Sequence, residues 1–227
     1  MIEEAKIMAR SALDGRWKLA VGAMLIYIVC VFVFAYLTLG IVFLCMILLI
    51  GSAFESVWNV VVYVCYGIGI FAISSSLAFG FLHICMKLAK GERTSKYDVF
   101  RYLHTARQIW TTGKAVGLVS LYTCLWSLLL IVPGMIKVFS YSMTYFILLE
   151  KPHYTTRQAI EESNALMEGQ KRKLFLLMLR FTGWILLCIL TCGIACLWII
   201  PYICVTISQF YLKISQTDIE LSINLVE

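Results

Sequence analysis

The sequence predicts an all-α integral membrane protein: a bundle of six transmembrane helices with amphipathic helices at the membrane surface. Hydrophobic residues make up 61% of the 227 residues and charged residues only 14%, whereas a soluble domain is about half apolar and a quarter charged. Long apolar runs recur along the chain, and the Lys and Arg residues fall in short clusters between them. One aqueous core cannot bury this much apolar surface, so lipid must solvate much of the chain.

The N-terminal part predicts a surface helix followed by the first span. Residues 2–14 carry apolar side chains at helical spacing and are followed by Gly15, which predicts the helix end. The Arg-Trp-Lys triplet at 16–18 marks a membrane interface, because an aromatic ring between two cations suits headgroup depth. Residues 19–39 then form the first span, since about 20 helical residues cross a hydrocarbon core.

A second span and a second surface helix are predicted next. Residues 57–86 are long and apolar enough to cross the membrane, and a polar, basic turn follows them. The preceding segment 41–54 is apolar but short, so it either extends the first helix or forms a re-entrant or outer-surface helix. Residues 94–109 predict an interfacial helix with Ser95 as its cap and Asp98 three residues later.

The third and fourth spans, 115–132 and 135–149, organise the chain as a hairpin. A Pro133-Gly134 pair separates two runs too apolar to face water. Such a pair is typical of a tight turn inside or at the edge of a bilayer. Both runs are short, so the membrane is expected to thin locally around them.

The remaining part predicts a third surface helix and two more spans. Residues 155–168 open with a capping-box pattern, Thr155 and Gln158, and carry apolar side chains on one face. Residues 174–192 form the fifth span and residues 194–212 the sixth, with a turn between them.

The distribution of cations predicts the orientation. If the N-terminus is cytoplasmic and six spans follow, the cytoplasmic segments hold all of the 19 Lys and Arg residues except Lys137 and Arg180. This is the positive-inside pattern, and it predicts a cell-membrane protein with both termini in the cytoplasm. A further crossing at 41–54 would place the most cationic loop on the opposite side from the N-terminal cluster.

The hairpin resembles a known family of small integral membrane proteins, mostly bacterial, that are grouped only as a domain of unknown function. The residues that carry the resemblance are Trp126, Ser127, Leu128, Leu129, Ile131, Pro133, Gly134, Ile136, Lys137, Tyr141, Ser142, Met143, Leu148, Glu150 and Pro152. The resemblance implies a six-helix membrane fold, and it implies no activity. The sequence departs from the family pattern at Gln170 and at Arg180.

A few polar residues within or beside the spans are candidates for a ligand or ion path. Lys137 either extends its ammonium group to the headgroups or points inward, toward a polar ligand or toward Glu55. Arg180 either extends toward the cytoplasmic face or packs against Glu150 or the segment around Tyr141. These residues would line the path if the protein moved a solute.

The sequence predicts no enzyme, metal site or cofactor. Motifs of hydrolases, zinc proteases and nucleotide-binding loops are missing. The nine cysteines lie in apolar runs, and His83, His104 and His153 are isolated. The clustered cations suit lipid headgroups rather than nucleic acid.

The favoured hypothesis is therefore a non-enzymatic protein of the bacterial cytoplasmic membrane. It would bind membrane lipids, especially anionic headgroups, an amphiphilic peptide or a membrane-protein partner through its hairpins and basic surface helices. A second hypothesis is a small permease whose path is lined by Lys137, Glu55 and Arg180. A third is an immunity protein that protects the cell against a membrane-active peptide.

Overall fold

The structure is a computed structural model that describes residues 2–48, 56–129 and 131–224, and its regular elements in these ranges are all helical. The elements are α1 (Ile2–Leu13), α2 (Trp17–Leu48), α3 (Ser56–Ala89), the 3₁₀ helix η2 (Lys96–Leu103), α4 (Ala106–Leu129), α5 (Ile131–Tyr141), α6 (Thr144–Glu150), α7 (Thr156–Leu166), α8 (Lys171–Leu190) and α9 (Cys196–Asn224). The predicted all-α class is thus confirmed.

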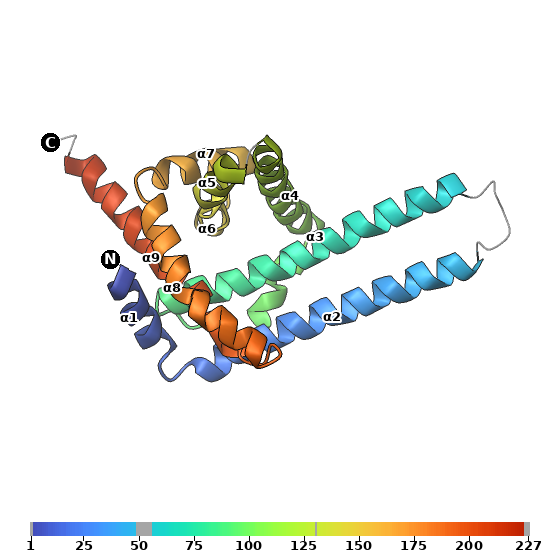
Figure 1. The fold of residues 1–227 in the computed structure, drawn as a ribbon, viewed down its shortest axis with the longest axis horizontal. Helices are drawn as coiled ribbons and strands as arrows, with labels where there is room; N and C mark the ends of the chain where they lie inside the picture. The colour runs from blue at the N-terminus through green and yellow to red at the C-terminus, as the bar shows by residue number, and fades with distance from the viewer. Residues whose placement is uncertain (1, 49–55, 130, 225–227) are drawn as a thin grey trace.

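The longest helices, α2 and α3, form an antiparallel hairpin that extends away from the other elements (Figure 1). α2 continues to Leu48, so the first helix extends into the predicted segment 41–54 at least as far as residue 48. Residues 49–55 lie outside the described ranges. α1 and the end of α9 lie on the side of the molecule opposite to the tip of this hairpin (Figure 1).

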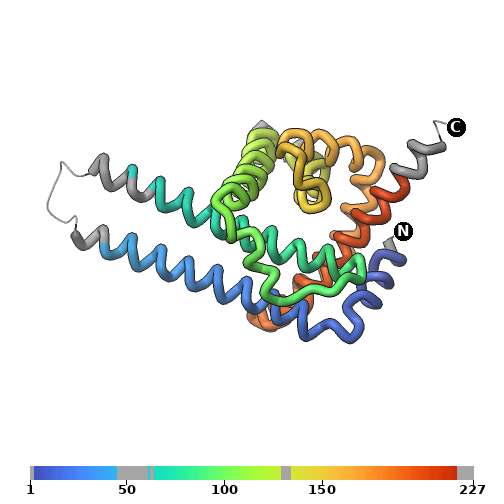
Figure 2. The backbone as a smooth tube through the Cα atoms, turned by 180° about the vertical axis from the view of Figure 1, so that it is seen from behind, coloured from blue at the N-terminus to red at the C-terminus, as the bar shows by residue number. Residues whose placement is uncertain are grey.

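η2 lies across the base of the α2–α3 hairpin, as the view from behind shows (Figure 2). Its predicted cap is confirmed: Tyr97 N donates to Ser95 Oγ at 3.4 Å, and Ser95 N donates to Asp98 Oδ2 at 3.2 Å. The predicted single helix over 94–109 is wrong, however, because η2 ends at Leu103 and α4 begins at Ala106.

The hairpin of α4 and α5 differs from the predicted one. Pro133 does not lie in a turn between helices but in the first turn of α5. In a first turn the missing N–H of proline costs no helical hydrogen bond. Gly134 packs against α4, since a β-carbon on it would lie 2.5 Å from Ser127 Oγ and 2.6 Å from Ser127 Cα. The predicted turn at Pro133-Gly134 is therefore wrong, and the glycine serves close helix packing.

The predicted fourth span, 135–149, is divided between α5 and α6. The Ser142 hydroxyl donates to Phe139 O at 2.7 Å at the end of α5, and such bonds compete with the helical ladder. α7 holds α5 from the side, because the buried Ser163 hydroxyl donates to Ser140 O at 2.7 Å. The predicted capping box of α7 at Thr155 and Gln158 is confirmed.

Four helices within the described ranges are long and apolar enough to cross a membrane: Trp17–Leu44, Val64–Ala89, Lys171–Leu190 and Cys196–Asp218. They correspond to the predicted first, second, fifth and sixth spans. The predicted third and fourth spans are not among them. α8 and α9 meet at the predicted turn, where Cys192 and Gly193 have φ of 51° and 89°.

The turn between α8 and α9 lies beside the beginning of α2 (Figures 1 and 2). The same region brings Trp17, in the first turn of α2, and Trp198, in the first turn of α9, to one cavity. In a bundle whose hairpins all cross from the same side, these residues would be about 30 Å apart, the thickness of the hydrocarbon core. The described arrangement is therefore not a simple bundle of parallel hairpins.

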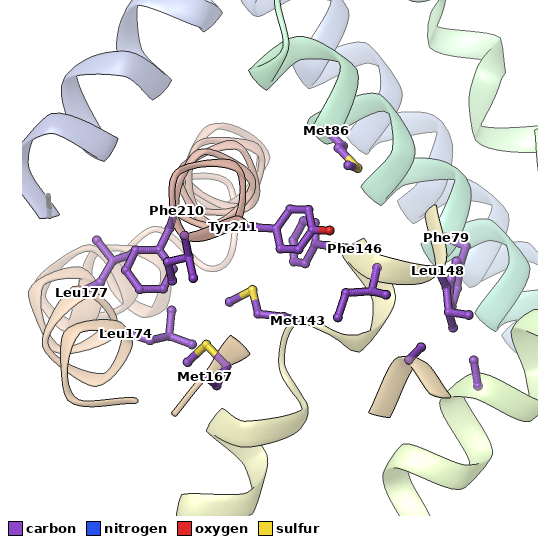
Figure 3. Close-up of a cluster of buried hydrophobic side chains, with 14 of the residues drawn as sticks. Phe79, Met86, Met143, Phe146, Leu148, Met167, Leu174, Leu177, Phe210 and Tyr211 are labelled. Carbon is purple, nitrogen blue, oxygen red and sulfur yellow. The ribbon is translucent and has the colours of Figure 1, made fainter. Parts of the chain in front are cut away.

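The buried core lies where the bases of the hairpins meet. Phe146 of α6 stacks on Tyr211 of α9, with ring centres 5.4 Å apart. Figure 3 shows this pair with its apolar neighbours, which are Phe79, Met86, Met143, Leu148, Met167, Leu174, Leu177 and Phe210. Away from this core the hairpins expose large apolar side chains, such as Leu128 at 84% and Leu190 at 81%, as expected for surfaces that face lipid.

Candidate anion-binding cavity

A cavity of about 530 Å³ opens between the start of α4 and the connection from α6 to α7. Three basic side chains line it: Arg107, Lys114 and His153. None of the described residues that line it is an Asp or a Glu. The cavity is therefore suited to an anion.

Aromatic rings position two of these side chains. Lys114 Nζ lies 4.9 Å from the centre of the Trp110 ring, and the His153 ring meets the Tyr154 ring edge-on at 4.9 Å. A cation over a ring face is held without a carboxylate partner, so the Lys114 ammonium can still take an anionic ligand. The aromatic faces also provide flat apolar surface beside the charges.

Two helices begin at this cavity. Arg107 and Gln108 belong to the first turn of α4, and Thr155 and Thr156 form the start of α7. The first N–H groups of a helix have no partner within the helix, and the helix dipole places partial positive charge there. Both helix starts therefore add to the positive potential that the side chains create.

The floor of the cavity is fixed by buried contacts. Thr112 and Ser76 share a buried hydrogen bond of 2.7 Å that joins α4 to α3. The Tyr102 ring of η2 packs against Phe79 with ring centres 6.1 Å apart, and burial raises the pKa of the Tyr102 hydroxyl. That hydroxyl thus stays protonated and can donate to a ligand.

A carboxylate near the cavity is already neutralised. Lys151 Nζ donates to Glu162 Oε1 at 2.7 Å, and this hydrogen bond raises the pKa of Lys151. Lys151 Nζ also lies 5.0 Å from the centre of the Tyr154 ring. The pair supports the wall of the cavity and removes a charge that would repel an anion.

The residues predicted as a site form different contacts. Lys137 Nζ lies 5.1 Å from the Trp126 ring centre and 5.7 Å from the Tyr141 ring centre. The α4–α5 hairpin therefore brings together, by cation–π contact, three of the residues on which the predicted resemblance rests. Glu55, the predicted partner of Lys137, lies outside the described residues.

The other two predicted site residues have partners that the sequence did not suggest. Arg180 forms an ion pair with Glu3 of α1. Glu150 accepts hydrogen bonds from Lys90 Nζ and Tyr211 Oη, both at 2.7 Å. Burial opposes ionisation of Glu150, but these two donors outweigh it and lower its pKa. Arg180 and Lys137 thus lie on different hairpins with different partners, and the permease hypothesis stays a prediction.

These contacts fall largely within one segment of the chain. Residues 122–218 match the family described as Protein of unknown function (DUF975). The match confirms the predicted resemblance to a family of unknown function. No curated protein and no solved structure matches the chain.

The DUF975 segment contains only part of the cavity. It runs from the second half of α4 into α9, so His153 and Tyr154 lie within it, and Arg107 and Lys114 precede it. Sequence reasoning did not select these cavity residues. A signal existed, because the cations between residues 96 and 114 alternate with tyrosine and tryptophan, but their convergence with His153 depends on the fold.

Proposed function

We propose that this protein is a non-enzymatic, multi-pass protein of the bacterial cytoplasmic membrane that binds the phosphate-bearing headgroup of an anionic lipid in this cavity. The observation that carries the proposal is the lining of the cavity, which holds Arg107, Lys114 and His153 and no acidic side chain. A guanidinium group matches a phosphate with two parallel hydrogen bonds, and an ammonium group adds a point charge. A volume of about 530 Å³ lies within the range of small-molecule pockets.

The proposed orientation places this cavity at the cytoplasmic leaflet. On this proposal the hairpins α2–α3 and α4–α5 each return the chain to the side from which it came. Residues 90–170 therefore stay on the side of the N-terminus whether the α4–α5 hairpin crosses fully, which gives six spans, or not. The cytoplasmic leaflet carries the anionic lipids that attract basic segments, so location and charge agree.

Lipid binding by the purified protein tests the proposal. In a neutral detergent, native mass spectrometry would compare dioctanoyl phosphatidylglycerol and dioctanoyl phosphatidic acid with dioctanoyl phosphatidylcholine. We expect the two anionic lipids to bind in preference to the zwitterionic one. Inorganic phosphate in the same assay distinguishes a headgroup site from a site for free phosphate. Equal binding of anionic and zwitterionic lipids would refute the proposal.

Variants locate the site. A hydrogen bond to a charged group contributes about 1.5–3 kcal/mol, so Arg107→Gln should weaken binding of the anionic lipids about 10-fold or more. Lys114→Gln should act in the same direction. Arg172→Gln is the matched control, because Arg172 is an exposed cation in the first turn of α8 that does not line this cavity. A control that loses as much affinity as Arg107→Gln would show that binding depends on net charge alone.

A further inference from the structure

A second cavity, of about 310 Å³, lies where α1 and the start of α2 meet α8 and α9. Three of the chain's six tryptophans line it, together with one arginine. Its lining residues are Arg10, Trp17, Trp184, Trp198, Ile199 and Tyr202. These residues come from four helices, so the cavity exists only when α1 is docked on α8 and α9.

The polar side chains that line this cavity carry almost only hydrogen-bond donors. A guanidinium group and indole N–H groups donate and cannot accept, and only the Tyr202 hydroxyl can do both. Within the described part of the chain, Arg10 takes part in no ion pair. The acidic residues of α1 are engaged elsewhere, because Glu3 pairs with Arg180 and Glu4 with Lys213. Such a site favours a ligand that offers negatively charged oxygen atoms.

The walls of the cavity also favour an apolar chain. The side chains of Trp184 and Trp198 remain half exposed, at 50% and 49%. Beyond them, α8 exposes Ile185 at 50% and Ile189 at 71%, so an apolar strip continues from the cavity along the helix. Trp17 belongs to the Arg-Trp-Lys triplet, which is typical of headgroup depth. The charge is therefore expected at the interface, with apolar surface beside it.

We propose that this cavity binds the anionic end of a membrane amphiphile, with its carboxylate or phosphate group on Arg10 and its hydrocarbon chain along α8. The site is separate from the first cavity, with which it shares no lining residue, and its argument does not depend on the proposed function. Because Arg10 lies on α1, an occupied site joins α1 to the α8–α9 hairpin.

Tryptophan fluorescence provides the test, since bromine atoms quench indoles at short range. The full-length protein in phosphatidylcholine nanodiscs would be titrated with 9,10-dibromostearate and, separately, with its uncharged methyl ester. We expect saturable quenching by the acid and much weaker quenching by the ester. Equal quenching by acid and ester would overturn the proposal, because it would reflect contact with hydrocarbon alone.

Competition distinguishes the sources of the anionic group. If the site accepts a lipid phosphate as well as a carboxylate, dioctanoyl phosphatidic acid should displace the brominated acid. If dioctanoyl phosphatidic acid does not displace it, the site is specific for carboxylates. Either result supports an amphiphile site. Inorganic phosphate at millimolar concentration should not displace it, and complete displacement would overturn the role of the chain.

Variants separate the two cavities. Arg10→Gln should raise the half-saturating concentration of the brominated acid about 10-fold, whereas Arg107→Gln and Arg172→Gln should leave it unchanged. Trp198→Phe should lower the amplitude of quenching while phosphatidylglycerol binding at the first cavity is kept, which shows that the protein is folded. An Arg10→Gln protein that binds phosphatidylglycerol normally and is quenched like wild type would overturn the proposal.

Discussion

A methyl group added at Gly80 tests how closely η2 packs on α3. In the structure, a β-carbon at Gly80 would lie 2.6 Å from the carbonyl carbon of Val99 and 2.9 Å from its Cα, and it would overlap the carbonyl oxygen. The atoms in the way belong to the backbone of a capped helical turn. A flexible side chain could move aside at small cost, but this backbone cannot. Gly80→Ala must therefore displace η2.

The size of the effect follows from what η2 buries. Overpacking of a filled site costs about 1–3 kcal/mol. Val99 is fully buried, and exposing part of its side chain adds up to about 1.5 kcal/mol. Alanine recovers up to about 1 kcal/mol relative to glycine within a helix. We expect a net loss of about 1.5–3.5 kcal/mol in the free energy of unfolding.

Gly69→Ala is the matched control, because Gly69 lies on the same helix and a β-carbon there meets no atom within 4 Å. Unfolding in mixed micelles with increasing SDS would compare both variants with wild type. We expect a lower midpoint for Gly80→Ala and an equal or slightly higher midpoint for Gly69→Ala. Trypsin should also cut faster after Lys96 and Arg101 in Gly80→Ala, since η2 is loosened. If both alanine variants unfold like wild type, the close approach of η2 to α3 is refuted.

Three further predictions concern the α4–α5 hairpin and the core. Gly134→Ala should lower the free energy of unfolding by about 1–3 kcal/mol, because its β-carbon would lie 2.5 Å from an atom of α4. Gly183→Ala is the control, since a β-carbon there meets no atom within 4 Å. Similar unfolding midpoints for the two variants would contradict the close packing of α5 on α4. Trp126→Leu should lower the free energy of unfolding by about 0.5–1 kcal/mol. A double-mutant cycle with Lys137→Met should show that the two residues are coupled across their 5.1 Å contact. If the effects of the two substitutions simply add, the cation–π contact is excluded. Glu150→Gln should be less stable than wild type at pH 7. The pKa of Glu150 is lowered in the folded protein from its ordinary value of 4.5. The stabilisation by ionised Glu150 is therefore present above pH 4.5 and disappears as the pH falls through the folded pKa. A stability difference between wild type and Glu150→Gln that persists in acid would contradict the prediction.

Features encoded locally could be predicted from the sequence. Both capping boxes, at Ser95 and at Thr155, join residues three positions apart and are found as predicted. The helix predicted at 2–14 is found as α1, Ile2–Leu13. These elements depend on side chains that satisfy neighbouring backbone groups, so the sequence alone contains the necessary information.

The α4–α5 hairpin shows why local signals can mislead. Pro and Gly side by side are typical of a turn, but each residue also has a role inside a helix. Pro133 fits the first turn of α5, and Gly134 admits Ser127 of the facing helix. Only the three-dimensional packing decides between these roles.

The candidate sites could not be derived because their residues are distant in the sequence. The first cavity joins Arg107 to His153, and the second joins Arg10 to Trp198. Arg180 has an apolar environment on its own helix, and its partner Glu3 lies at the other end of the chain. Periodicity identifies which residues share a face of one helix, but it does not tell which helix docks against that face.

The orientation of the chain is the prediction that depends least on these details. If α2–α3 and α4–α5 each return the chain to the side from which it came, as proposed, residues 11, 93 and 164 lie on one side of the membrane whether or not the α4–α5 hairpin crosses fully. Single cysteines introduced into a cysteine-free protein at Ser11, Arg93 and Asn164, which are exposed positions, should all be labelled by a membrane-impermeant maleimide from the cytoplasmic side only. Labelling of Arg93→Cys from the opposite side to Ser11→Cys would mean that α2 or α3 does not cross as part of a hairpin. In that case the first cavity would not face the cytoplasmic leaflet, and anionic headgroups would not reach the proposed site.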